Sequence, residues 1–330
     1  MWKDIGKLFI RLISVVLPVC IFLMLYAALF PMYYLDPEYA MYKQQKDVIT
    51  GNIEAGENIK TLVIGDSRAK AAFMPEYLSD DCYNLALGGT TPIEGFYTLK
   101  EYLRQYEAPE YLILCYAPMH YEDKDTLWTR SIYFHMINDE DMMEIFDIAN
   151  GCEVNDNILI EDYFKEWLMY RTYMPNKYCT AIRNSIFSDR YKENKAKYEY
   201  VTTHRGQAYF GVEDENGGVN GEAKEEKFIP SDVITIYLGK IFDLCRENNI
   251  KVIIEQTPMN ETSLKIIDRQ YRHDFKDYMD MVEKMDKDAR VYDYFYEYPN
   301  SYFGDADHLN EQGVKEYCIY LNEAYPEVFD

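Results

Sequence analysis

Apolar residues along the chain gather in five short runs that are separated by longer stretches with helical spacing. The runs are rich in β-branched and aromatic residues, which is typical of buried strands. They are TLVIG (61–65), CYNLA (82–86), YLILCYA (111–117), KVIIEQT (251–257) and RVYDY (290–294). Because strands that alternate with helices pair in parallel through crossovers, the pattern predicts a three-layer α/β sandwich. Its ligand crevice would lie at the carboxyl ends of the strands.

Several stretches between these runs are predicted to be helices. Ser231 is a suitable N-cap for a helix that places Val233 and Tyr237 on one apolar face. Further helices are expected at 139–148, 160–173, 266–287 and 314–325. The alternation of strands and helices is interrupted at 118–230, which is predicted to be an insertion or cap beside the crevice. Within it, the Gly-, Asn- and Glu-rich stretch 214–226 is expected to form an exposed loop.

The N-terminus carries an uncharged apolar segment at 12–35, which as a helix of 1.5 Å per residue would measure about 36 Å. That length is sufficient to cross the hydrocarbon core of a bilayer, which is about 30 Å thick. A cleaved signal peptide is the alternative, but its apolar region is usually only about 7 to 15 residues long. The sequence is therefore divided into a transmembrane anchor (1–35), a polar tether (36–60) and an α/β domain (61–330).

Charge and cysteine content narrow the class of function. The chain has 34 Lys and Arg against 57 Asp and Glu, a net charge of −23, which disfavours binding to nucleic acid. Seven scattered cysteines without a Cys-x-x-Cys pair predict neither a zinc site nor a disulfide framework, although a pairing outside the membrane stays open.

Ser67 directly follows the first predicted strand, in the stretch Gly65-Asp66-Ser67. A side chain there lies at the carboxyl edge of the sheet, and its backbone N–H lies at the start of a helix, where partial positive charge favours an oxyanion. This is a suitable place for a nucleophile. The alternative is that the serine only caps the helix.

A serine nucleophile needs a base, and among the five histidines only His308 has a carboxylate three residues before it, Asp305. This pair follows the last strand and precedes the last helix, so it is expected at the same sheet edge as Ser67. His308 would take the proton from Ser67, and Asp305 would orient the imidazole. Alternatively, Asp305 and Asp307 could bind a metal ion.

Gly88 and Gly89 follow the second predicted strand. A backbone without side chains can turn its N–H groups toward Ser67 and stabilise a tetrahedral intermediate. Paired glycines also occur at such turns for conformational reasons alone.

Together these residues resemble the SGNH/GDSL hydrolase family. Gly65-Asp66-Ser67 matches its first block, Gly88 or Gly89 its second, and Asp305-x-x-His308 its last. The third block usually has Gly-x-Asn-Asp, whereas this chain has YAPMHYED (116–123) without an asparagine. This departure, the anchor and the Gly-Asp-Ser-Arg form are similar to the membrane-anchored acyl-transfer branch that includes DltD and the alginate O-acetyltransferases.

The resemblance implies a flavodoxin-like parallel sheet of about five strands after one transmembrane helix. It also implies a serine acyl esterase or O-acyltransferase without a cofactor, which acts outside the cytoplasm on a cell-surface glycan or glycolipid. A membrane-bound O-acyltransferase (MBOAT) is the partner it suggests. Two alternatives remain open, a catalytically silent glycan-binding or scaffold module and a metal-dependent glycosyltransferase.

The flanking charges of the apolar segment predict its orientation. They are Lys3, Lys7 and Arg11 before the segment, and Asp36 and Glu38 after it. Because the basic flank of a transmembrane helix stays in the cytoplasm, protease added to intact cells should digest the chain beyond about residue 40 and spare its first residues. Digestion only after lysis would show the opposite orientation.

Overall fold

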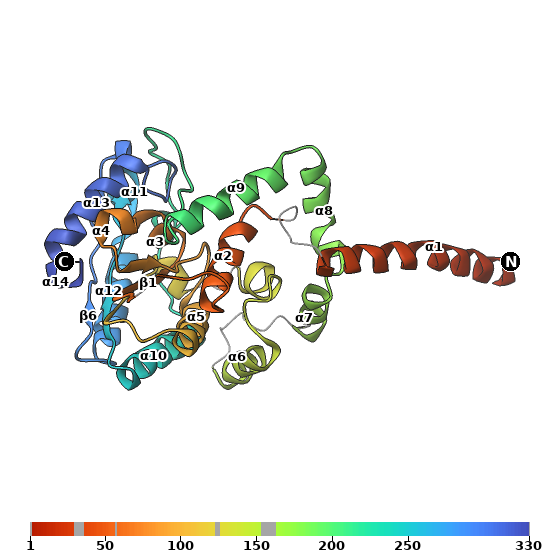
Figure 1. Cartoon of the computed structure of the whole chain (residues 1–330), viewed down its shortest axis with the longest axis horizontal. Coiled ribbons are helices and arrows are strands. Elements are labelled where there is room, and N and C mark those ends of the chain that lie inside the picture. Colours follow the sequence, from red (N-terminus) through yellow and green to blue (C-terminus); the bar gives the residue numbers. More distant parts are fainter. Residues whose placement is uncertain (1, 30–35, 57, 123–125, 153–162, 330) are drawn as a thin grey trace.

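The computed structural model describes residues 2–29, 36–56, 58–122, 126–152 and 163–329. The chain is a mixed α/β protein with a five-stranded parallel sheet and one long N-terminal helix that extends away from the rest (Figure 1). The sheet confirms the predicted parallel pairing, and each strand lies within one of the five predicted runs.

The strand order in the sheet is β2-β1-β3-β4-β6. The strands are β1 (Thr61–Gly65), β2 (Cys82–Asn84), β3 (Tyr111–Cys115), β4 (Lys251–Ile254) and β6 (Arg290–Val291). Two shorter strands, β5 (Met259–Asn260) and β7 (Glu297–Tyr298), pair separately. Because β1 lies between β2 and β3 in this order, its carboxyl end adjoins the carboxyl ends of both.

Side chains alternate between the two faces of the sheet, as the two-residue period of a strand requires. Leu62 and Ile64 of β1 pack in one apolar cluster with residues of the helices α5 (Pro92–Gln105), α10 (Asp232–Glu247) and α12 (Arg269–Glu283). Val63 between them packs in a second cluster with residues of α3 (Ser67–Ala72), α4 (Pro75–Leu78) and α13 (Glu311–Ala324). The core is therefore divided into two parts by the sheet.

The helices have the following bounds. They are α1 (Trp2–Leu29), α2 (Tyr39–Ile49), α3 (Ser67–Ala72), α4 (Pro75–Leu78), α5 (Pro92–Gln105), α6 (Asp139–Gly151), α7 (Tyr163–Arg171), α8 (Pro175–Ile186), α9 (Arg190–Thr203), α10 (Asp232–Glu247), α11 (Glu261–Ile266), α12 (Arg269–Glu283), α13 (Glu311–Ala324) and α14 (Pro326–Phe329). Shorter helical turns are η2 (Pro118–Tyr121), η3 (Leu127–Ile132), η4 (Glu222–Lys224) and η5 (Asn300–Tyr302).

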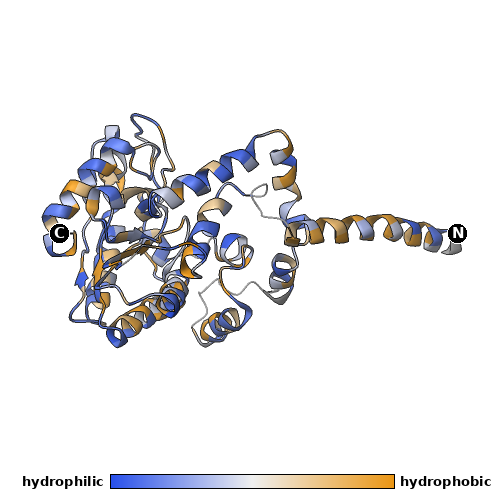
Figure 2. Cartoon of the chain, viewed as in Figure 1, coloured by the Kyte–Doolittle hydropathy of each residue, from blue (hydrophilic) through white to orange (hydrophobic). Residues whose placement is uncertain are grey.

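Helix α1 is long and apolar enough to cross a membrane or to be a signal sequence, and within Asp4–Leu29 an 18-residue window has a mean hydropathy of 2.7. Figure 2 shows apolar residues along most of its length. Residues 30–35 of the predicted anchor lie outside the described residues.

The sequence predicts a tether at 36–60, but the structure has helix α2 there. Met41, Tyr42 and Val48 of α2 are fully buried, and Gln44 and Gln45 bond to the Tyr83 hydroxyl and the Leu85 carbonyl. The prediction failed because glutamines and lysines interrupt the apolar period of this helix. The domain therefore begins at least as early as α2.

Other helix predictions differ from the structure in detail. Ser231 caps α10 as expected, by accepting a hydrogen bond from the Ile234 N–H. The stretch 266–287, however, contains the end of α11 and then α12, because the Asp268 side chain accepts a hydrogen bond from the Gln270 N–H and starts a new helix. Within 118–230 the structure has α6, α7, α8 and α9, so this stretch is largely helical. The part of the predicted helix 160–173 before Tyr163 lies outside the described residues.

None of the seven cysteines, all of which the structure describes, forms a disulfide. Cys82, Cys115, Cys245 and Cys318 are buried, and burial raises the pKa of each of these thiols. The fold is therefore held by packing, hydrogen bonds and ion pairs.

The packing of α2 gives a stability prediction. Met41→Ala should lower the free energy of unfolding by about 2–5 kcal/mol, because it removes a fully buried side chain. Thr50→Ala, at the exposed end of α2, is the control and should change it by no more than about 0.5 kcal/mol. Urea unfolding of the full chain in detergent micelles measures both, and equal small effects would show that α2 does not stabilise the domain.

Candidate functional site

The turn from β1 into α3 places Ser67 at the carboxyl edge of the sheet. Only glycine fits at position 65, because a Cβ there would lie 2.0 Å from the Cys115 carbonyl oxygen of the neighbouring strand. The buried Asp66 carboxylate accepts hydrogen bonds from the N–H groups of Arg68 (2.8 Å), Ala69 (3.3 Å) and Ala117 (2.6 Å). It thus caps α3 and ties the turn to the chain after β3.

Ser67, His308 and Asp305 form a continuous chain of hydrogen bonds. The Ser67 Oγ is 2.7 Å from His308 Nε2, and His308 Nδ1 is 2.9 Å from both Asp305 carboxylate oxygens. Ser67 and His308 are 241 residues apart in the sequence, and the structure brings all three predicted residues together. The distances are those expected for a nucleophile, its base and the group that orients the base.

The Asp305 carboxylate is held in place by its own loop. The backbone N–H groups of Asp307 and His308 each donate to Asp305 Oδ1 at 2.8 Å. Burial raises the pKa of Asp305, but the hydrogen bond and charge of His308 and these two N–H groups outweigh burial and lower it overall. Asp305 therefore stays ionised and can stabilise a protonated His308.

Phe210 stacks on the imidazole of His308, with ring centroids 4.6 Å apart and planes inclined by 19°. Its neighbour Gly211 lies so close to Gly304 that a Cβ on Gly211 would be 2.2 Å from the Gly304 carbonyl carbon. The segment after α9 is thus fitted against the loop that carries Asp305 and His308, and it limits the movement of the imidazole.

Lys70 connects the same segment to α3. Its buried ammonium donates to the carbonyls of Ala86 (2.9 Å) and Gly206 (2.6 Å), and burial lowers its pKa to about 7. Lys70 therefore fixes the chain four residues before Phe210.

Gly88 of the predicted glycine pair lies beside Ser67, and Gly89 follows it in the same turn. A Cβ on Gly88 would be 3.6 Å from the Ser67 Cβ, and Gly89 has a positive φ of 75°. The backbone N–H groups of Ser67 and Gly88 make no hydrogen bond to any other residue that the structure describes. The Gly88 carbonyl, which belongs to the peptide between Gly88 and Gly89, accepts from the Tyr42 hydroxyl (2.8 Å). Both N–H groups can therefore serve as donors next to the hydroxyl of Ser67.

Arg68, next to the serine, forms a buried ion-pair network. Its Nη2 is 2.7 Å from Glu222 Oε2 and 2.8 Å from Asp307 Oδ1. Burial lowers the pKa of the guanidinium, but these two carboxylates outweigh burial and raise it overall. Arg68 therefore links α3, the stretch after α9 and the loop of His308.

The chain after β3, where the asparagine of the third block is missing, approaches Asp66. The Ala117 N–H and His120 Nε2 lie 2.6 Å and 3.4 Å from Asp66 Oδ2. Both atoms face the carboxylate that shapes the turn before Ser67. Among the described residues, these two groups support the turn before Ser67 and do not provide a third oxyanion donor beside the Ser67 hydroxyl.

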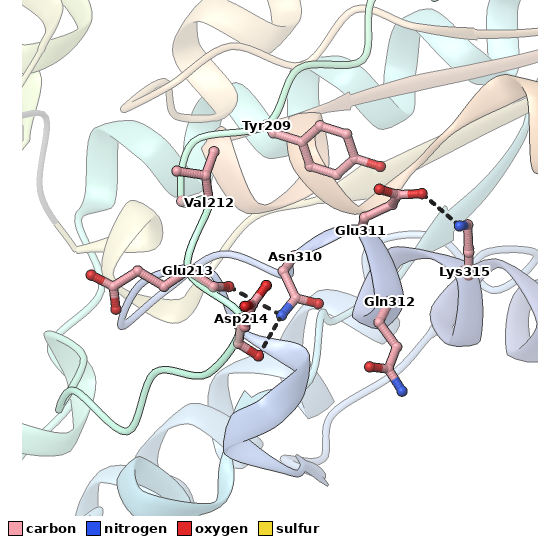
Figure 3. Close-up of a pocket in the computed structure, with 9 residues that line it drawn as sticks. Tyr209, Val212, Glu213, Asp214, Asn310, Glu311, Gln312 and Lys315 are labelled. Atoms are coloured by element: carbon pink, nitrogen blue, oxygen red, sulfur yellow. Dashed lines mark hydrogen bonds and ion pairs between the residues drawn. The ribbon is translucent and has the colours of Figure 1, made fainter.

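An open pocket of about 630 Å³ lies between the segment 209–214 and the start of α13 (Figure 3). Tyr209, Val212 and Glu213 line one wall, and Gln312 and Lys315 of α13 line the other. The Asn310 amide donates to the carbonyls of Glu213 and Asp214, both at 3.3 Å, and so closes its base. The lining offers polar groups and one aromatic ring, and it includes Asn310, two residues after His308.

Comparison with known proteins finds similarity over one part of the chain. A family model for a domain of unknown function matches residues 212–329, which is about a third of the chain and includes Asp305 and His308 but not Ser67. No curated protein matches the chain.

Sequence reasoning missed several residues of the site. Phe210 and Glu222 lie far from the motifs, and Glu222 is buried although the composition of 214–226 predicts an exposed loop. The sequence marks Glu38 only as a flanking charge, whereas its buried Oε2 lies 3.0 Å from the Cβ position of Gly88. The arginine in Gly-Asp-Ser-Arg is the available signal for Glu222, because a buried guanidinium needs a carboxylate.

The Arg68 network predicts unequal effects of its two carboxylates. The Glu222 side chain is 0% exposed and that of Asp307 is 38% exposed. Glu222→Ala should therefore lower the free energy of unfolding by about 3–5 kcal/mol, the cost of leaving a buried charge without its buried partner. Asp307→Ala should lower it by no more than about 1 kcal/mol. Urea unfolding compares the two, and an equal loss would contradict the assigned burial.

Proposed function

We propose that the chain is a membrane-anchored, extracytoplasmic SGNH-type serine acyl esterase or O-acyltransferase. The observation that carries this proposal is the hydrogen-bonded chain from Ser67 through His308 to Asp305. A serine hydroxyl with a positioned base and an oriented imidazole is the arrangement used for nucleophilic attack on an acyl carbonyl.

In the proposed reaction, Ser67 Oγ attacks the carbonyl carbon of an ester and His308 Nε2 takes the hydroxyl proton. The tetrahedral intermediate then collapses, the alkoxide leaving group receives that proton, and the acyl group stays on Ser67. Water or an acceptor hydroxyl next attacks the acyl-enzyme, and His308 takes its proton and returns it to Ser67. Asp305 remains a carboxylate throughout.

In the proposed reaction, the backbone N–H groups of Ser67 and Gly88 donate hydrogen bonds to the oxyanion, and Gly89 shapes the turn. Gly88 lies beside Ser67, and the N–H groups of both residues have no partner among the residues that the structure describes. Donors already in place lower the barrier because they need no rearrangement when charge develops.

The fold supports the same assignment. We propose a three-layer, flavodoxin-like sandwich, because numbering the five strands in chain order gives the arrangement 2-1-3-4-5 that is typical of that fold. The two apolar clusters on opposite faces of the sheet agree with it. Ser67 lies where such sheets place their ligands, at the carboxyl end of β1.

The proposed substrate is an acylated glycan or glycolipid at the cell surface. The pocket beside the segment 209–214 has the polar groups and the tyrosine ring that a carbohydrate requires. The proposed partner is a membrane-bound O-acyltransferase that would supply acyl groups, and the membrane itself holds the chain through α1.

A catalytically silent SGNH-like module that binds glycans or supports such a partner is the second candidate. The observation that favours it is the missing asparagine of the third block, whose place is taken by groups that face Asp66. A metal-dependent glycosyltransferase has less support, since Asp305 and Asp307 are engaged by His308 and Arg68 respectively.

The triad gives a prediction on activity. Ser67→Ala and His308→Ala should each lower turnover of p-nitrophenyl acetate by a factor of about 10⁴ to 10⁶, and the double variant should lose little more, since the residues act as a unit. If the double variant instead lost activity by the product of the two single factors, Ser67 and His308 would not act as a unit.

Two controls separate the alternatives. Asp305→Asn should reduce turnover more than Asp307→Asn, because only Asp305 contacts the imidazole. A chelator should have no effect on a serine enzyme, whereas a metal enzyme would lose its activity and a silent module would show none to lose.

A further inference from the structure

The corner between α8 and α9 carries two adjacent large apolar residues that are highly exposed. Ile186 is 69% exposed and Phe187 is 87% exposed, and Tyr191 at the start of α9 is 40% exposed. Packing into the core of the chain does not account for apolar side chains at these positions. A patch of this kind indicates contact with a partner or a membrane.

The charge around this corner is opposite to that of the protein. Residues 175–200 contain six Lys and Arg and three Asp and Glu, a net charge of +3 in a chain whose net charge is −23. Arg183 and Lys192 are exposed and Arg190 is half-buried. Apolar side chains beside basic ones are typical of segments that lie on an anionic lipid surface.

The corner is also next to the helix that would cross the membrane. Phe22 and Tyr26 of α1 line an apolar groove of about 380 Å³ together with Ile182 and Ile186 of α8. Ser185 in the same groove gives its hydroxyl to the Ala181 carbonyl at 2.8 Å, so its polar group is already paired within α8. In Figure 1, α8 runs across the end of α1 rather than along it.

The contact with α8 lies in the half of the apolar segment that is farther from the basic flank. The uncharged part of α1 begins at Leu12, after Arg11, and at 1.5 Å per residue Phe22 and Tyr26 are about 15 and 21 Å from its start. In a hydrocarbon core about 30 Å thick, both residues belong to the leaflet farther from Lys7 and Arg11. The side chains of α8 that face α1 therefore adjoin this leaflet.

We propose that the α8–α9 corner is a lipid-binding surface. In this arrangement Ile186 and Phe187 insert into the interface of an anionic membrane, and Arg183, Arg190 and Lys192 bind its headgroups. The inference rests on the proposed membrane anchor, because it places the corner on the same bilayer that α1 crosses. It adds a second contact that sets the height and tilt of the domain.

Helix α9 would connect this lipid-binding surface to the candidate active site. The helix is bonded to α2 by Tyr198 Oη, 2.6 Å from Asp47 Oδ2, and to the chain before α2 by the Asn194 amide, which donates to the Asp36 carbonyl at 2.7 Å. The chain after α9 leads directly to Phe210 on His308. With 14 residues, α9 spans about 21 Å and so keeps the site at a fixed distance from the lipid surface.

Photocrosslinking of the full chain tests the proposal. The chain is reconstituted in vesicles of phosphatidylcholine and phosphatidylglycerol, with p-benzoylphenylalanine in place of Phe187, Val212 or Phe9. Position 187 should crosslink to radiolabelled phospholipid, whereas position 212, which is also highly exposed (86%) but lies beside α13, should not. Position 9, in the first half of α1, should crosslink in every case.

The outcomes distinguish this inference from the anchor itself. Lipid crosslinks at position 9 but not at 187 would overturn the lipid-binding surface and leave the anchor intact. Their absence at both positions would refute the anchor. A protein crosslink at 187 in native membranes, without a lipid crosslink, would assign the corner to a protein and overturn the proposal.

The basic residues of the corner allow an independent test of the proposal. Exchanging Arg183, Arg190 and Lys192 for Glu should weaken crosslinking at 187 in the anionic vesicles, since each basic residue near such a surface contributes about fivefold to binding. In vesicles of phosphatidylcholine alone the same exchange should have little effect. An equal effect in both lipids would contradict the role of charge.

Discussion

The site depends on how closely β1 approaches β3 before the chain turns into α3. At Gly65 the two backbones leave no room for a side chain, and the Asp66 carboxylate then joins the first turn of α3 to Ala117 beyond β3. These contacts fix the direction in which Ser67 leaves the sheet. Three backbone N–H groups hold the Asp66 carboxylate, and Asp66 precedes Ser67 directly. Ser67 can therefore keep its hydroxyl 2.7 Å from the imidazole of His308, which lies on a separate loop.

Much of the fold could be predicted because parallel strands are buried on both faces and therefore appear as short apolar runs. Ser67 and the Asp305–His308 pair could be related to each other from the sequence, since both follow strands whose carboxyl ends share one edge. That inference requires only the order of elements along the chain. The distances between the side chains, and the fact that the N–H groups of Ser67 and Gly88 have no partner among the described residues, emerge only in three dimensions.

The remaining parts depend on tertiary contacts that leave no local signal. Helix α2 has buried glutamines that bond to groups on the segment 83–85, so its sequence resembles a polar linker. Glu222 is buried within a stretch with the composition of a loop, because it pairs with Arg68. Phe210 reaches His308 only because Gly211 and Gly304 allow two backbones to touch.

The cysteines, none of which forms a disulfide, have a consequence for how the fold responds to thiol reagents. Four of the seven are buried, with pKa values that burial raises, so these four thiols carry little reactive thiolate at neutral pH. The described fold thus contains no covalent cross-link that a reductant could break, and its buried thiols are shielded from reagents that modify cysteine.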